Sequence, residues 1–356
     1  MQALQLYAGP RARFRLAERG LRPDDVSIIP AAAGGPKGLI LNALDRHIFG
    51  PWLGGSKQEV HLLGASIGAW RMATACLGDA EAEFTRLAEE YAHQDYDHAP
   101  GKPPTAASVS QGFGAKLDEV FGGREGQVLS HPRYRLHLFT SRGRHLLGRE
   151  GRLRTPLGYM GAFATNLVSR RAMGAWLERV VFSDLRSPLP LLLKDYRSRQ
   201  VALSIRNLQQ ALLASCSIPF WLQAVHDIPG APRGAYWDGG ITDYHLHLDY
   251  AQMLGDGLVL YPHFQRRVVP GWLDKALKHR HAPSAFLDNV VVLAPSEGFV
   301  KSLPRGKLPD RADFQHYGDD VAARATAWLR AVREGERLRD EFTALCEQPS
   351  IQALPL

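Results

Sequence analysis

Residues 59–78 read EVHLLGASIGAWRMATACLG, and this stretch decides the fold that we expect. Residues 59–65 are a short, largely apolar run, which is typical of a buried strand. Residues 67–78 are small and apolar enough to form a buried helix. Ser66 therefore stands on the turn between a predicted strand and a predicted helix.

The same order of elements occurs just before this stretch. Residues 26–32 (VSIIPAA) predict a strand, and residues 34–50 (GGPKGLILNALDRHIFG) predict a turn that opens a helix. A second, more exposed helix is expected at 81–94. Two successive strand–helix units with right-handed crossovers place their strands in one parallel sheet. We predict a three-layer α/β/α fold with a mostly parallel central sheet.

The rest of the chain continues this pattern less clearly. Residues 95–114 are polar and rich in glycine and proline, which predicts a long loop or lid. Because no linker or repeat divides the chain, we expect a single domain over 1–356, in which 244–356 add strands, helices and lid or membrane-facing elements. Further strands are predicted at 134–141, 179–184, 201–204, 255–262 and 289–295, and further helices at 167–177, 207–214 and 321–342.

Composition excludes several classes of protein. With 356 residues, 45% hydrophobic and 22% charged, the chain is neither disordered nor fibrous. Its three cysteines, Cys76, Cys216 and Cys346, are far apart and lack metal-ligand spacing, so we expect neither disulfides nor a zinc site. No signal peptide or membrane-spanning stretch is apparent. A cytoplasmic location is the expectation.

The positive charge of the chain suits an anionic partner. The formal net charge is +7, and the basic residues are mostly arginines scattered along the sequence. No nucleic-acid-binding motif is present, so we expect no nucleic-acid partner. Residues 264–281 (FQRRVVPGWLDKALKHRH) mix apolar and basic side chains. This segment predicts either peripheral contact with an anionic membrane or an ordinary surface helix whose apolar stripe faces the core.

The first motif that carries chemistry is G-x-S-x-G, formed by Gly64, Ser66 and Gly68. A nucleophile on a sharp strand-to-helix turn needs flanking glycines, because side chains there would collide with the neighbouring backbone. The alternative is a tight turn in which Ser66 only caps the next helix.

The second motif is Gly34-Gly35-Pro36-Lys37-Gly38, which also follows a predicted strand. Backbone N–H groups of consecutive glycines can converge on an anion, and Gly34 and Gly35 are the candidate donors to an oxyanion or a phosphate. Pro36 has no N–H to donate. The alternative is a structural glycine turn.

The third motif is Asp238-Gly239-Gly240, which follows Tyr236 and Trp237. An apolar approach raises the pKa of a carboxyl group and favours its use as a base. The alternative is an ordinary loop turn.

Together, the three motifs resemble those of the patatin-like phospholipase family. In that family a glycine-rich oxyanion loop, a G-x-S-x-G elbow and a D-G-[GA] tripeptide occur in this order. Residues 211–225 are also similar to its A-S-x-x-x-P-x-x-F stretch, with Leu222 at the final aromatic position. The resemblance covers 26–243. It departs from the pattern at Ala33, where a glycine is usual, and at Lys37, where arginine is common.

The resemblance implies a serine acyl-ester hydrolase that acts on lipids, similar to phospholipase A or lysophospholipase. Ser66 would be the nucleophile, Asp238 its base, and the amides of Gly34 and Gly35 the oxyanion hole. Neither metal nor cofactor is implied. The remaining motif glycines would support this geometry: Gly38, Gly64, Gly68, Gly239 and Gly240.

A direct Ser–Asp pair requires a partly dry site, because a carboxylate is otherwise a weak base. Trp237, Phe220 and Trp221 are the expected sources of that dryness.

Two other interpretations remain open at this point. A Ser-His-Asp hydrolase would use a histidine, and Asp238 followed by His245 or His263 would fit the order of an α/β-hydrolase. A non-catalytic lipid or acyl-binding protein would keep the same scaffold. The sequence does not indicate an oligomeric state. The candidate histidines are His226, His245, His247 and His263.

Overall fold

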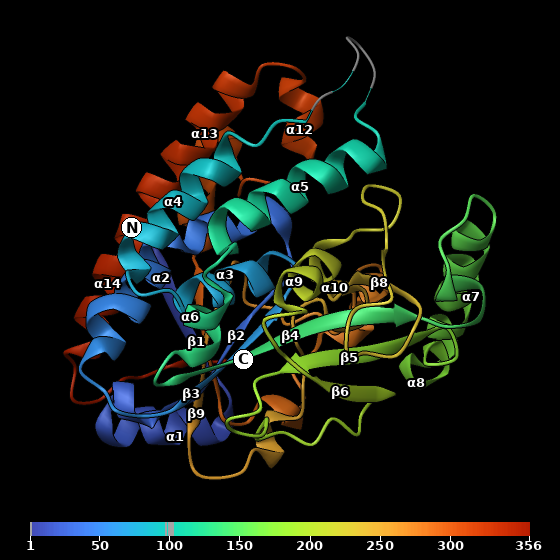
Figure 1. Ribbon diagram of the computed structural model, residues 1–356. Coiled ribbons are helices and arrows are strands. Elements are labelled where there is room, and N and C mark those ends of the chain that lie inside the picture. Colours follow the sequence, from blue (N-terminus) through green and yellow to red (C-terminus); the bar gives the residue numbers. More distant parts are fainter. Residues whose placement is uncertain (1, 97, 99–102) are drawn as a thin grey trace.

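A computed structural model describes residues 2–96, 98 and 103–356. Within this part of the chain, eleven strands form one sheet at the centre of the molecule (Figure 1). Nine of them follow one another in space as β11 (Leu354–Pro355), β1 (Leu4–Ala8), β10 (Val290–Pro295), β9 (Leu258–Pro262), β2 (Val26–Ala31), β3 (Val60–Ala65), β4 (Tyr134–Gly143), β5 (Leu177–Ser183) and β6 (Ser198–Ala202). The short strands β7 (Val225–His226) and β8 (Ala235–Asp238) pair with each other, and β8 also pairs with β4.

The middle of the sheet is parallel. Strands β10, β9, β2, β3 and β4 run in one direction, while β1 is antiparallel to β10 and β5 is antiparallel to β4. Helices flank this sheet, with α4, α5 and α13 gathered on one side of the view in Figure 1. The predicted α/β class with a mostly parallel central sheet is confirmed.

The helices account for most of the remaining chain. Their bounds are α1 (Pro10–Arg19), α2 (Asn42–His47), α3 (Ile67–Ala75), α4 (Ala80–Ala92), α5 (Ala106–Phe121), α6 (Glu125–Ser130), α7 (Arg154–Val168), α8 (Arg170–Met173), α9 (Leu208–Cys216), α10 (Gly240–Asp243), α11 (Glu297–Ser302), α12 (Ala312–Tyr317), α13 (Val321–Glu334) and α14 (Glu336–Cys346). No helix of the described chain is long and apolar enough to cross a bilayer.

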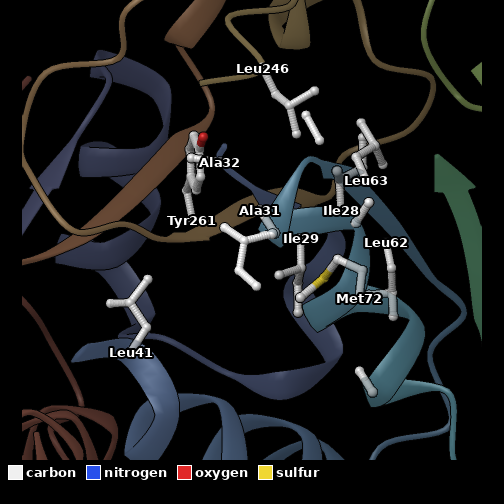
Figure 2. Close-up of a cluster of buried hydrophobic side chains, with 14 of the residues drawn as sticks. Ile28, Ile29, Ala31, Ala32, Leu41, Leu62, Leu63, Met72, Leu246 and Tyr261 are labelled. Atoms are coloured by element: carbon white, nitrogen blue, oxygen red, sulfur yellow. The ribbon is translucent and has the colours of Figure 1, made fainter. Parts of the chain in front are cut away.

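The core is centred on β2, β3 and α3. All six residues of β3 and all nine of α3 are buried. Successive strand residues point to opposite faces, so Ile28 and Ile29 of β2 can both be buried only if both faces of the sheet are covered. Figure 2 shows these two side chains with Leu62, Leu63 and Met72. A strand whose residues are all apolar, without polar alternation, is therefore typical of a buried parallel sheet.

Two glycines allow α3 to lie directly against the sheet. A Cβ atom on Gly64 would come within 2.4 Å of the Cα of Ala69, and a Cβ on Gly68 would come within 2.0 Å of the carbonyl oxygen of Ala31. Both distances are far below van der Waals contact. The glycines that flank Ser66 are therefore required by packing, which is what the strand–turn–helix interpretation expects.

The prediction of a long loop at 95–114 is wrong in its second half. Helix α5 begins at Ala106, and the Thr105 side chain caps it by accepting a hydrogen bond from the amide of Ser108. Buried Phe113 and Leu117 hold the helix against the core, and this long-range packing is invisible in a glycine-rich local sequence. Within the predicted lid, 97 and 99–102 lie outside the described residues.

Three helix predictions also need correction. The helix expected at 167–177 is replaced by the end of α7, the short α8 and the start of β5. The helix expected at 321–342 is divided at Gly335 into α13 and α14; a Cβ on Gly335 would meet the carbonyl oxygen of Ile40 at 2.8 Å, so close packing favours glycine there. Residues 264–281 contain only two short 3₁₀ turns, at Trp272–Asp274 and Lys278–His281.

Candidate active site

The long strand β4 brings the two halves of the site together. One edge of β4 pairs with β5 from His137 to Gly143. Its other edge pairs first with β3, where Ala65 lies opposite Phe139, and then with β8, where Asp238 lies opposite Thr140. Strands β3 and β8 therefore meet end to end on one edge of β4. Residues that are remote in the sequence become neighbours at this point.

Ser66 and Asp238 lie at that meeting point and touch. The Ser66 hydroxyl donates a hydrogen bond of 2.6 Å to Oδ2 of Asp238, and both residues are buried. The backbone of Ser66 has φ 57° and ψ −131°. A non-glycine residue in this region is strained, and such strain is typical of a nucleophile held on a sharp strand-to-helix turn.

The carboxyl group of Asp238 is held from two sides. Its Oδ1 accepts a hydrogen bond of 2.7 Å from the amide of Gly240, which leaves Oδ2 for Ser66. Burial raises the pKa of the Asp238 carboxyl above its usual range, although the Ser66 hydroxyl and the Arg311 guanidinium act in the opposite direction. A carboxylate with a raised pKa is a better base.

The stretch around Ser215 ties the two residues to each other. Ser215 Oγ accepts a 2.9 Å hydrogen bond from the amide of Ser66 and donates one of 2.7 Å to the carbonyl oxygen of Phe139. The carbonyl oxygen of Ser217 accepts a 2.9 Å hydrogen bond from the amide of Asp238. The A-S-x-x-x-P stretch seen in the sequence therefore links the backbones of Ser66 and Asp238, a role that the sequence did not reveal.

The glycine loop lies beside these two residues. Gly34 lines the same pocket as Ser66, and Gly35 has a φ of 56°, where a side chain would strain the backbone. Among the described residues, neither amide of this pair has a hydrogen-bond acceptor. A Cβ on Gly38 would meet its nearest atoms at 3.6 Å, which is ordinary contact, so packing does not require glycine there.

A pocket of about 260 Å³ opens over Ser66 and Asp238. Its lining contains both apolar and charged side chains, so it can take an amphipathic molecule. The apolar wall consists of Ala33, Ile218, Pro219, Ile241, Tyr244 and Trp272, and the charged wall of Lys37, Lys275, Asp310 and Arg311.

Three cations of the charged wall lack an ion-pair partner within the described chain: Lys37, Lys275 and Arg311. The ammonium group of Lys275 lies 4.2 Å from the ring centre of Tyr244, and burial of that group lowers the pKa of Lys275 to about 8. Burial also lowers the pKa of Lys37. The pocket therefore holds three cations and two carboxylates, Asp238 and Asp310, and this excess of positive charge favours an anionic ligand.

Lys275 and Arg311 come from the part of the chain after 243. The sequence pattern indicated Lys275 only as part of the segment 264–281 and did not indicate Arg311. No local motif marks either residue, since each reaches the pocket through the fold alone.

The candidate histidines lie elsewhere. No histidine is among the described residues that line the pocket. The Nδ1 atoms of His245 and His263 accept hydrogen bonds of 3.0 Å from the backbone amides of Val269 and Gln265, respectively, and both rings are buried. Burial lowers the pKa of His263 to about 3. Neither ring is placed to take a proton from Ser66.

The expected aromatic surroundings are only partly as predicted. Trp237 is fully buried and packs edge-on against Tyr159 at a ring distance of 5.9 Å. Phe220 and Trp221, in contrast, are each 60% exposed. They cannot keep the site dry in this conformation. The apolar contribution near Asp238 comes from Trp237, Tyr159 and the pocket wall.

The described residues contain no group of three or more His, Cys, Asp or Glu side chains arranged to hold a metal ion. Cys76, Cys216 and Cys346 are free thiols.

Comparison with known proteins places this geometry in a family. The family model described as "Patatin-like phospholipase" matches residues 34–245, which is more than half of the chain and includes both Ser66 and Asp238. No curated protein sequence matches. Among solved structures, "Human GIVD cytosolic phospholipase A2" is 13% identical, with a TM-score of 0.37; the match covers 94% of this chain and 63% of that one. The chain thus spans less than two thirds of the length of that protein. On the extent of the family match, the chain belongs to the patatin-like phospholipase family.

Proposed function

We propose that the chain is a serine hydrolase that cleaves acyl esters of lipids, with Ser66 as nucleophile and Asp238 as base. The observation that supports this proposal is the 2.6 Å hydrogen bond from the Ser66 hydroxyl to Oδ2 of Asp238, buried beside the glycine loop in a pocket with an apolar wall. Membership of the patatin-like phospholipase family supports lipid hydrolysis at the level of the class.

In the first half of the reaction, Ser66 Oγ attacks the ester carbonyl carbon while Asp238 Oδ2 takes the hydroxyl proton. The resulting tetrahedral oxyanion would accept hydrogen bonds from the unpartnered amides of Gly34 and Gly35. One such donor contributes about 10²–10³ to the rate. The carbon–oxygen bond to the leaving alcohol then breaks, and Asp238 returns its proton to that oxygen, which leaves an acyl group on Ser66.

The second half repeats these steps with water. Asp238 takes a proton from a water molecule that attacks the acyl carbonyl, and the oxyanion again lies against the glycine amides. When the acyl–serine bond breaks, the proton returns to Ser66 Oγ and the fatty acid leaves. The direct contact between Ser66 and Asp238 and the absence of histidine from the described pocket lining favour this pair over a triad.

The charged wall indicates which esters the pocket takes. Lys37, Lys275 and Arg311 line the pocket and outnumber its two carboxylates, Asp238 and Asp310, and such a set suits a phosphate-bearing lipid. We therefore infer that phospholipids or lysophospholipids are the substrates. Since the pocket draws residues from both sides of position 243, we also infer that 1–356 act as one domain.

Labelling with a fluorescent phosphonate that reacts with active-site serines tests the proposal. We expect covalent labelling of the wild-type chain at Ser66, located by peptide mass spectrometry, and none in Ser66→Ala, because only a serine with a nearby base is nucleophilic. Ser204→Ala is the control and should label normally. A folded wild-type chain that resists labelling would favour the non-catalytic binding protein.

Removal of the pocket cations should change substrate preference. We expect Lys275→Gln and Arg311→Gln each to lower kcat/KM by about tenfold for a short-chain phospholipid, which corresponds to about 1.4 kcal/mol. A neutral p-nitrophenyl ester should be affected much less, because it has no charge to bind. Lys301→Gln removes an exposed lysine of α11 and serves as the control. Equal losses on both substrates would contradict a role in headgroup recognition.

A further inference from the structure

Helix α7 carries exposed apolar side chains on the side that faces away from the protein. Thr155, Tyr159, Ala162 and Asn166 are buried against the protein at helical spacing. The opposite side, here called the outer face of α7, is exposed although it carries no charge: it consists of Leu153, Leu157, Met160, Phe163, Leu167 and Val168. A surface helix normally has a polar outer side, so this arrangement needs a partner to cover it.

The position of the helix leaves this face accessible. Figure 1 shows α7 at the right-hand edge of the molecule, beyond β4 and β5 and away from the main group of helices. Exposed fractions of 50% for Leu157, 61% for Met160 and 40% for Phe163 show that the described chain itself does not cover them.

Helix α7 reaches the mouth of the pocket through Tyr159 of its buried side. Tyr159 on α7 packs against Phe220 at a ring distance of 6.0 Å. Phe220 and Trp221 follow directly after Pro219, which lines the pocket, and both are largely exposed. Phe220 also has a φ of 70°, a strained backbone for a bulky residue, and its ring remains in solvent. Apolar surface thus extends from α7 to the rim of the pocket.

A second contact fixes α7 to the other side of the opening. The side-chain amide of Asn166 donates a 2.8 Å hydrogen bond to Oδ1 of Asp274, and Arg170 forms an ion pair with the same carboxylate. Trp272, two residues before Asp274, lines the pocket. The helix is therefore held rigidly beside the entrance.

Charge around the helix indicates what covers it. Residues 144–177 contain six arginines and a single acidic residue, Glu150. Arg152, Arg154 and Arg171 are exposed near the two ends of α7. A second copy of the chain, packed face to face, would bring these like charges together. An anionic surface would instead attract them.

We propose that the outer face of α7, together with Phe220 and Trp221, docks on the surface of an anionic lipid bilayer. The apolar side chains enter the boundary between headgroups and acyl chains, and the flanking arginines lie at the level of the phosphates. Because this surface adjoins the pocket, docking turns the opening over Ser66 toward the lipid. The segment 264–281, which the sequence suggested for membrane contact, is not a helix and buries Val268 and Val269.

Co-sedimentation of the full chain with vesicles tests this proposal. A Ser66→Ala chain is used throughout, so that the result does not depend on hydrolysis. We expect binding to vesicles of phosphatidylcholine with phosphatidylglycerol, weaker binding to phosphatidylcholine alone, and loss of binding as salt is raised. The triple variant Leu157→Ser, Met160→Ser, Phe163→Ser should bind at least about tenfold more weakly, because it removes apolar area from the inserted face.

The control is Phe14→Ser on α1, which removes a more exposed ring from a helix far from α7 and should bind as Ser66→Ala alone. The triple variant in an active chain should retain hydrolysis of a soluble short-chain ester, which separates failure of docking from failure of the chemistry. Binding that is absent, or equal in the triple variant, overturns the proposal. A dimer in analytical ultracentrifugation that the triple variant abolishes also overturns it, since a second copy would then cover the face.

Discussion

Asp238→Asn is expected to lower kcat for a p-nitrophenyl ester by about 10²–10⁴-fold, the range that general acid–base catalysis contributes. Asparagine can still accept the hydrogen bond that the amide of Gly240 donates to Oδ1 of Asp238. Its Nδ2 would then face Ser66, where it can donate a hydrogen bond but cannot take a proton. The variant therefore keeps the geometry and loses the base. Steady-state kinetics over a range of ester concentrations measure the effect.

His245→Gln provides the comparison for this substitution. His245 is the first candidate histidine downstream of Asp238, but its ring is buried with Nδ1 bonded to the amide of Val269. We expect a folded His245→Gln chain to keep most of its kcat. If this variant is folded by circular dichroism yet as inactive as Asp238→Asn, a histidine takes part and the direct Ser–Asp pair is wrong.

The placement of Ser66 and Asp238 was predictable because each motif is local. Glycines are needed at 64 and 68 because α3 packs closely against the ends of β2 and β3 there. The pattern G-x-S-x-G is therefore a direct consequence of packing. Gly239 has a similar cause, since a Cβ there would lie 2.0 Å from the carbonyl oxygen of Phe139. Short, sterically forced patterns of this kind remain visible in a single sequence.

The charged wall of the pocket was not predictable in the same way. Arg311 reaches the opening from the residue that precedes α12, more than 240 positions after Ser66, and nothing in its neighbourhood marks it. Strand β1 was missed because its sequence, LQLYA, is short and shows little alternation of polar and apolar residues. The strand is stabilised by antiparallel pairing with β10, which lies near the other end of the chain. Such contacts depend on the assembled sheet.

Exposure was the property that sequence patterns predicted least well. Phe220 and Trp221 were expected to be interior residues, because aromatic side chains usually are. Helix α7 was missed except at its C-terminal end, since polar Thr155 and Asn166 are buried while Leu157, Met160 and Phe163 are exposed, which removes the amphipathic period. Where a protein keeps apolar side chains in solvent for a partner, hydrophobicity no longer predicts burial. These errors in exposure fall on the surface that we propose for lipid docking.

The free energy of unfolding is expected to fall steeply as the pH is lowered from about 6.5 to about 4. Four histidines are fully or almost fully buried: His61, His137, His245 and His263. Burial lowers the pKa of His61 to about 4 and that of His263 to about 3, and it holds the pKa values of His137 and His245 well below 6.5. Their folded forms therefore stay neutral in this pH range, while the unfolded chain takes up protons below its ordinary pKa of about 6.5.

The sign follows from which state binds more protons. Above pH 6.5 these histidines are neutral in both the folded and the unfolded chain, so the free energy of unfolding is not reduced. Below pH 6.5 the unfolded chain binds protons that the folded chain does not, and the free energy of unfolding falls until the pH reaches the folded pKa values. At about 1.4 kcal/mol per pKa unit, His61 alone costs about 3 kcal/mol by pH 4. The other three histidines act in the same direction, and the whole stability of a typical protein is only about 5–15 kcal/mol, so acid unfolding is expected. Urea titrations at successive pH values measure the slope.

His61→Gln isolates one member of this group. His61 Nδ1 lies 3.0 Å from Nε2 of His137, and glutamine can keep a hydrogen bond to that ring without taking up a proton. The slope of unfolding free energy against pH should then decrease by the equivalent of up to one proton, whereas His279→Gln, which removes an exposed imidazole, should leave it unchanged.

Because Glu59 lies 3.6 Å from Nε2 of His61 and opposes the effect of burial, His137→Gln should reduce the slope at least as much. A wild-type chain whose stability is constant between about pH 6.5 and 4 would show that these rings are hydrated or protonated in the folded state.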